Sequence, residues 1–130
     1  MAHVIVEYTA NIRTEAGIPA LLRTINDNLI AQLGVFPIGG IRSRALELTD
    51  FRMADGAADY AFVHITLKMG AGRDPATRKR VGDELFEAVK SHFAGLYAHR
   101  LLALSMEVVE FDERGTYKHN NVHQRFRRPA

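Results

Sequence analysis

The sequence contains no cysteine, so it forms no disulfide bonds and has no thiolate chemistry. It also lacks any run of about 18 apolar residues, the length that a membrane-spanning helix needs. The basic, apolar and small-residue segments of a signal peptide are missing as well. These absences are typical of a cytoplasmic protein in a reducing environment, and we expect this localisation and no membrane partner.

The totals that remain are ordinary for a soluble globular protein. Hydrophobic residues make up 47% of the chain and charged residues 25%. The 130 residues are enough to bury a real core but too few to divide into two domains. The length therefore predicts a single domain, residues 1–130.

Hydrophobic periodicity predicts the same order of elements twice, namely a strand, a helix and a second strand. The strands alternate with a two-residue period, and the helices carry apolar residues three and four apart. The predicted elements are a strand from residue 2 or 3 to 8, a helix at 18–33, strands at 41–48 and 60–69, a helix at 75–96 and a strand at 102–111. The repeat halves run from about residue 2 to 57 and from 58 to 112, and residues 113–130 form a polar tail.

The predicted helices carry recognisable end signals. Pro19 lies near the start of the first helix, whose apolar stripe extends to Leu33, and Gly34 is placed to end it. Asp74 and Pro75 are placed as the N-cap and first residue of the second helix.

Long strand–helix–strand connections favour parallel pairing within each half. The expected fold class is therefore α/β (α+β), with one four-stranded sheet and both helices on one face. The other sheet face is expected to be partly apolar, with Ile5, Phe62 and Val109 as candidates. A monomer would leave this face in water, so we expect an oligomer.

Two arginines in "GIRSR" (40–44) are the first candidates for a binding site. Alternation along a strand places Arg42 and Arg44 on the same face, about 7 Å apart. Such a pair is suited to clamping two carboxylates through bidentate hydrogen bonds. The alternative is a pair of solvated arginines bonded to nearby acids.

A second candidate is Arg73 in "GAGRD" (70–74). It lies just before a predicted helix N-terminus, whose dipole favours anions, and glycines allow close backbone approach. The alternative is a turn that needs glycine for its backbone angles. Arg13 holds the matching place in the first half.

Histidines and the basic tail indicate less. His119 and His123 have a helical metal-ligand spacing, but no acidic or cysteine ligand accompanies them, so structural roles are favoured and no metal site is predicted. His64 is expected to be a hydrogen-bonded sheet residue. "RFRR" (125–128) is a weak nucleic-acid signal at a net charge of +2, and a solvated tail or packing arm is favoured.

The chain start raises a further possibility. A strand that begins at residue 2 or 3 can hold the α-amine in a pocket, where burial and arginines lower its pKa toward neutral and make it a general base. The alternative is a first strand that is simply tied into the sheet.

Taken together, these stretches resemble the 5-carboxymethyl-2-hydroxymuconate Δ-isomerases of the tautomerase superfamily. The matching segments, which run in order through nearly the whole chain, are "HVIVEY", "FPIGGIRSR", "MADGAADYAFVHITLKMGAGR", "LFEAVKSHFAGL", "RLLALSMEVVE" and "NNVH". The resemblance implies a homotrimer with sheets around a central barrel. It also implies a cofactor-free tautomerisation of an unsaturated hydroxy-tricarboxylate from homoprotocatechuate breakdown.

The resemblance also implies residue roles. The family's base is an N-terminal proline exposed by removal of the initiator methionine, and this position is Ala2 here. Arg42 and Arg73 correspond to the carboxylate-binding arginines, Arg44 is a further candidate beside Arg42, and Phe36 is expected to supply an apolar wall.

Alanine at residue 2 departs from the family pattern. Two functions therefore remain open from the sequence: an isomerase whose base is the Ala2 amine, and a trimeric carboxylate-binding protein with weak or lost turnover. A nucleic-acid module that uses the basic tail is a third and weaker hypothesis, and we expect no nucleic-acid partner.

Overall fold

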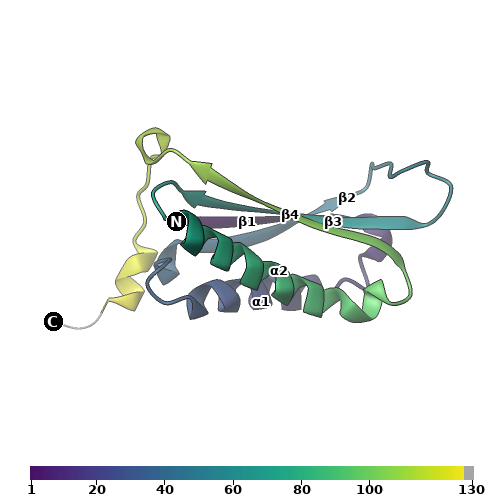
Figure 1. Cartoon of the computed structure of the whole chain (residues 1–130), viewed down its shortest axis with the longest axis horizontal. Coiled ribbons are helices and arrows are strands. Elements are labelled where there is room, and N and C mark those ends of the chain that lie inside the picture. Colours follow the sequence, from purple (N-terminus) through teal and green to yellow (C-terminus); the bar gives the residue numbers. More distant parts are fainter. Residues whose placement is uncertain (128–130) are drawn as a thin grey trace.

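The first strand of the chain lies inside the sheet, with a hydrogen-bonded neighbour on each side. The computed structural model describes residues 1–127 and orders the four strands β2-β1-β3-β4 (Figure 1). β1 (Ala2–Thr9) pairs in parallel with β2 (Ile41–Leu48) and antiparallel with β3 (Tyr60–Gly70). β3 in turn pairs in parallel with β4 (Leu101–Phe111).

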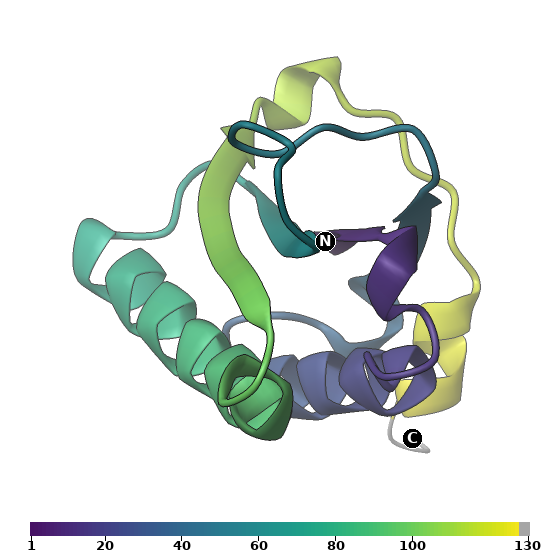
Figure 2. The same ribbon diagram turned by 90° about the vertical axis from the view of Figure 1, so that its right-hand side faces the viewer.

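Both long helices lie on the same face of this sheet, as Figure 2 shows end-on. α1 (Ile18–Ala31) connects β1 to β2, and α2 (Pro75–Tyr97) connects β3 to β4. The predicted pair of β-α-β units in one four-stranded sheet is therefore confirmed, with parallel pairing inside each unit.

Four short 3₁₀ helices complete the described chain. They are η1 (Ala10–Ile12), η2 (Ile38–Gly40), η3 (Glu113–Gly115) and η4 (Val122–Phe126). After β4 the chain turns through η3 and crosses the end of the sheet to pack η4 against η2 (Figure 1). This C-terminal segment, residues 112–126, brings the predicted polar tail beside the N-terminus.

The core lies between the helices and the inward sheet face, as the two periodicities predict. In β3 the buried residues alternate strictly, at Ala61, Val63, Ile65, Leu67 and Met69. The apolar stripe of α2 is buried at Val81, Leu85, Val89, Phe93 and Leu96. Asp74 caps α2 by accepting a hydrogen bond from the Thr77 N–H (2.7 Å), and Pro75 begins the helix, so both predicted start signals are confirmed.

One predicted core residue is wrong. α1 ends at Ala31, and Leu33 lies beyond it with 90% of its surface exposed. Gln32 leaves helical backbone angles, and its N–H bonds the Leu29 carbonyl in a tightened last turn (3.2 Å). Because the helix ends before its next turn, its buried apolar stripe ends at Leu29 and does not reach Leu33 as predicted.

The outward sheet face is mixed in character. Ile5 and Phe62 are half-buried on it and Val109 is exposed, which agrees with the predicted apolar content. His64 is bonded to Ser105 (2.7 Å) and to Glu107 (3.1 Å), the sheet role that the sequence predicted. Within residues 1–127, no helix is long and apolar enough to cross a membrane.

Leu29 and Leu33 offer a direct test of where the core ends. Replacing fully buried Leu29 by alanine is expected to lower the free energy of unfolding by about 2–5 kcal/mol, because it leaves a cavity. Leu33→Ala, the matched control four residues on, is expected to change it by less than about 0.5 kcal/mol. Urea unfolding followed by circular dichroism measures both, and equal losses would contradict the helix end at Ala31.

Candidate active site

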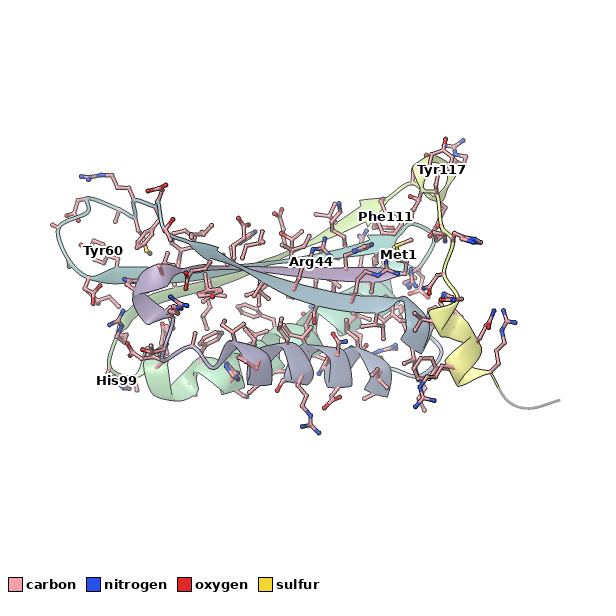
Figure 3. The ribbon with its side chains drawn as sticks, turned by 180° about the vertical axis from the view of Figure 1, so that it is seen from behind. Met1, Arg44, Tyr60, His99, Phe111 and Tyr117 are labelled. Atoms are coloured by element: carbon pink, nitrogen blue, oxygen red, sulfur yellow. The ribbon has the colours of Figure 1, made fainter. Side chains whose placement is uncertain are left out.

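The start of the chain is fixed at one end of the sheet because β1 is its second strand. Ala2 lies opposite Ile41 of β2 and Met69 of β3, and no part of it is exposed. Met1 precedes it, half-buried, so the free α-amine belongs to Met1 and the nitrogen of Ala2 is an amide. Figure 3 shows Met1 at the same end of the molecule as Phe111 and Tyr117, with Arg44 nearer the middle of the sheet.

Arg73 is held rigidly beside this amine. Its guanidinium donates two hydrogen bonds to the Val35 carbonyl (2.8 and 3.3 Å) and one to the Gly70 carbonyl (2.9 Å). A guanidinium has five N–H donors, so one N–H on each terminal nitrogen remains for a ligand. This geometry suits a cation that is oriented by backbone and still able to bind a carboxylate.

The ring of Phe36 lies against the guanidinium of Arg73. The ring is buried, and the guanidinium carbon of Arg73 lies 4.6 Å from its centroid. The contact is a cation–π interaction, which gives Phe36 a place beside a predicted carboxylate-binding residue.

Arg42 and Arg44 both point from the outward sheet face, as strand alternation predicted. Arg44 donates to Nδ1 of His3 (3.1 Å), and no described residue pairs with either arginine through a carboxylate. Within residues 1–127, neither arginine is therefore bonded to a nearby acid, as the alternative prediction would require. Register places His3 between Arg42 and Lys68 in a row of nitrogen-bearing side chains.

The C-terminal segment closes the site on its outer side, which the sequence analysis missed. The largest cavity at this end has a volume of about 1050 Å³ and is lined by Met1, Arg42 and much of residues 116–123. Asn120 donates to the Gly39 carbonyl (2.9 Å), and His123 packs so closely on Gly39 that a Cβ there would lie 2.9 Å from it. The "HNNVH" histidines are thus partly structural, since His123 also contacts the Asn120 amide (3.3 Å).

The positive charges at this end of the sheet lower the pKa of the titratable groups among them. Burial, then the positive charges of Arg73 and Lys118, lower the pKa of the Met1 α-amine below its ordinary 8.0, while Glu113 opposes them. Burial and the charges of Arg42 and Arg44 lower the pKa of His3 as well. A neutral His3 accepts the Arg44 hydrogen bond, which agrees with this direction.

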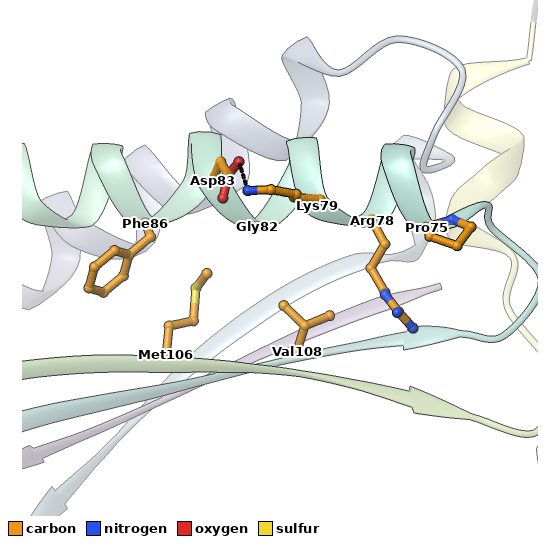
Figure 4. Close-up of a pocket in the computed structure, with 8 residues that line it drawn as sticks. All are labelled: Pro75, Arg78, Lys79, Gly82, Asp83, Phe86, Met106 and Val108. Atoms are coloured by element: carbon orange, nitrogen blue, oxygen red, sulfur yellow. Dashed lines mark hydrogen bonds and ion pairs between the residues drawn. The ribbon is translucent and has the colours of Figure 1, made fainter.

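A second groove lies between α2 and β4, away from the amine (Figure 4). Its cations are already neutralised, since Lys79 pairs with Asp83 (2.8 Å) and Arg78 with Glu110. Phe86, Met106 and Val108 make the rest of this groove apolar. It therefore offers no free charge to a polyanionic ligand.

Two other sequence candidates do not contribute to the site. Within residues 1–127, no three histidine, cysteine, aspartate or glutamate side chains gather as a metal site. Arg13, the counterpart of Arg73, is paired with Glu47 (3.3 Å) and lies 72% exposed. Of "RFRR", residue 128 lies outside the described residues.

Comparison with known proteins agrees with this geometry over nearly the whole chain. The family model for 5-carboxymethyl-2-hydroxymuconate isomerase matches residues 2–126. The 5-carboxymethyl-2-hydroxymuconate Delta-isomerase of Escherichia coli is 50% identical over 127 residues, which are 98% of this chain and 100% of that protein.

Solved structures extend the likeness to the fold. A 5-carboxymethyl-2-hydroxymuconate isomerase from Deinococcus radiodurans R1 superposes with a TM-score of 0.93 at 45% identity, covering 98% of this chain and 95% of that one. A macrophage migration inhibitory factor-like protein from Entamoeba histolytica shares the fold at a TM-score of 0.60 and 15% identity, over 91% and 96% of the two chains. The chain belongs to the 5-carboxymethyl-2-hydroxymuconate isomerase family, and its fold is that of the tautomerases.

Proposed function

We propose that this isomerase converts 5-carboxymethyl-2-hydroxymuconate, or a similar unsaturated hydroxy-carboxylate, to its oxo isomer. The observation that carries the proposal is the set of cations around the chain's first amine. Arg42, Arg73 and Lys118 all act on that amine, in or beside a cavity of about 1050 Å³. A site of this charge selects a substrate that carries several carboxylates.

Arg42 and Arg73 bind substrate carboxylates in this proposal. Arg73 keeps two N–H groups free beyond its bonds to backbone carbonyls, and the side chain of Arg42 gives no hydrogen bond to any residue in 1–127. Arg44 is a weaker binder, because it already donates to His3. Phe36 positions Arg73 from below.

The base is the amine of Ala2 after removal of Met1. The small side chain of alanine permits this removal. The amine takes the proton of the 2-hydroxyl group, the C–O bond becomes a carbonyl, and the double-bond electrons shift toward a distant carbon. That carbon gains a proton, so the reaction is a net isomerisation. The arginines stabilise the dienolate that exists between the two proton transfers.

A base in this place works near neutral pH. Burial and neighbouring cations lower the pKa of the Met1 amine, and we expect them to act in the same direction on an Ala2 amine one residue further in. A base whose pKa lies close to the working pH is the most effective one.

A carboxylate-binding protein without turnover is the second candidate. The observation that favours it is alanine at residue 2, where the family pattern has proline, because a primary amine lacks the rigid ring and the basicity of proline's secondary amine. The same cations would still bind a polycarboxylate.

We also infer that the working form is a homotrimer. The apolar residues of the outward sheet face and of the α2–β4 groove remain uncovered in one chain. The edges of β2 and β4 carry unpaired backbone groups, which a neighbouring copy satisfies.

Turnover is checked by following the ultraviolet absorbance of the dienol substrate, with Met1 removal verified by intact mass. We expect the Met1-free protein to exceed the uncatalysed rate. Ala2→Pro is expected to raise kcat by about tenfold, or about 1.4 kcal/mol in barrier, because the ring fixes a more basic secondary amine. No rate above background from either Met1-free form, across muconate-type substrates, would sink the isomerase. Carboxylate binding without any rate would favour the second candidate.

Arg73→Ala is expected to lower kcat/KM by an amount equivalent to about 1.5–3 kcal/mol, through loss of a charge-assisted bond. Arg13→Ala is the matched control from the first half of the chain, where the arginine faces Glu47. Steady-state kinetics of both variants make the comparison. If the two variants behave alike, Arg73 does not belong to the site.

The Arg73 variant also has a pH signature. Removing a cation that lowers the pKa of the amine raises that pKa, so the acid limb of kcat/KM moves to higher pH. An unmoved limb would mean that Arg73 does not act on the base.

The assembly is checked by light scattering on a sizing column. The expected mass is three times the 14.5 kDa of one chain. A mass of one chain at micromolar concentration would contradict the trimer.

A further inference from the structure

An ion pair in the C-terminal segment lies at the amine end of the sheet, and neither of its members has yet been given a contact with the substrate. Nζ of Lys118 donates to Oε2 of Glu113 (2.8 Å), and the two side chains are 48% and 44% exposed. Lys118 lines the same cavity as Met1 and Arg42. The pair is therefore part of the site wall and not of a remote surface.

The Glu113 carboxylate lies against the backbone that holds Arg73. Its Oε1 sits so close to Gly70 that any Cβ there would overlap it. The carbonyl of that same glycine accepts a hydrogen bond from Arg73 (2.9 Å). Glycine at the end of β3 thus leaves room for a carboxylate beside Arg73.

The groups around the Glu113 carboxylate favour its charged form. The Lys118 hydrogen bond, and then the charges of Lys118, the N-terminal amine and Arg73, hold the pKa of Glu113 below its ordinary value. The charges that act on Glu113 from the site are thus all cationic, and a substrate carboxylate in this place would meet the same ones.

The chain just beyond Lys118 is anchored to η2. Two residues further on, Asn120 donates to the Gly39 carbonyl, and its own Oδ1 accepts the Val122 N–H (2.8 Å). Glu113 lies in η3, a single short turn whose residues are exposed. Because both side chains of the pair are about half exposed, exchanging the glutamate for another carboxylate costs little.

We propose that Lys118 binds one carboxylate of the substrate, and that Glu113 occupies that place as an internal stand-in until the substrate displaces it. The assignment rests on the proposed function, because it supplies a third cation for a substrate with three carboxylates. Arg42 and Arg73 take two of them, and Lys118 takes the third. A bound tricarboxylate beside Glu113 would crowd negative charge, so its arrival drives the glutamate out.

Equilibrium binding tests this assignment without depending on turnover. Isothermal titration calorimetry with tricarballylate, an unreactive tricarboxylate, and with glutarate, a dicarboxylate, uses the full chain at constant salt. Lys118→Met is expected to weaken tricarballylate binding by about tenfold and glutarate binding far less. Glu113→Gln is expected to strengthen tricarballylate binding several-fold, because the competing charge is gone.

A matched pair on α2 controls for general charge effects. Lys90 and Glu87 form an ion pair of similar length (3.0 Å), away from the cavity. Lys90→Met and Glu87→Gln are expected to leave both affinities unchanged. Three results would each overturn the assignment. In the first, Lys118→Met changes the affinities no more than Lys90→Met does. In the second, Lys118→Met weakens both ligands equally, and in the third, the unaltered protein does not bind tricarballylate.

The same data separate this inference from the proposed function. Protein that binds tricarballylate through Lys118 but never isomerises a dienol refutes the isomerase and leaves the assignment standing. Active protein whose KM for a tricarboxylate substrate is unaffected by Lys118→Met refutes the assignment and leaves the isomerase standing.

Discussion

The pairing of β1 on both sides is the constraint on which the rest of the site depends. A strand with one neighbour would fray at its first residue, whereas Ala2 has Ile41 on one side and Met69 on the other. The backbone at the start of the chain is therefore as fixed as the core beneath it. The loop that carries Arg73 and the residues of η2 can then pack beside the fixed backbone at the start of β1.

Concentrating cations around an amine disfavours the folded state unless something offsets the repulsion. Three features offset it here. The guanidinium of Arg73 donates hydrogen bonds to backbone carbonyl groups and contacts the Phe36 ring. His3 stays neutral between its charged neighbours. Among the described residues, Glu113 contributes the negative charge that opposes the cations acting on the Met1 amine. The site is thus charged enough to attract a polyanion, yet the empty protein tolerates it.

Much of the fold can be predicted from the sequence because most of its helices and strands are amphipathic. The alternation of 60–69 and the apolar stripe of α2 show which face of each element turns to the core. Alternation along the strand 41–48 likewise places Arg42 and Arg44 on one face. Leu33 was wrongly predicted to belong to the buried stripe of the first helix, because the helical spacing of apolar residues continues past Gln32, where the backbone leaves the helix. Phe36 is expected to supply an apolar wall, and its contact with the Arg73 guanidinium is a further feature that the sequence does not indicate. Lys118 and Glu113 gave no signal, because their positions depend on Gly39 and Gly70, far away in the chain.

The two β-α-β units differ in a way that no copying of residues can remove. Both units carry an arginine after their first strand, but Arg13 faces Glu47, while Arg73 faces the amine end of the sheet. A polypeptide has one amino terminus, so β3, which starts at Tyr60 in the middle of the chain, has only amide nitrogens. An internal repeat can duplicate cations, glycines and strands, but it cannot duplicate the α-amine of the chain. Each chain therefore has one α-amine, and it lies at one end of the sheet.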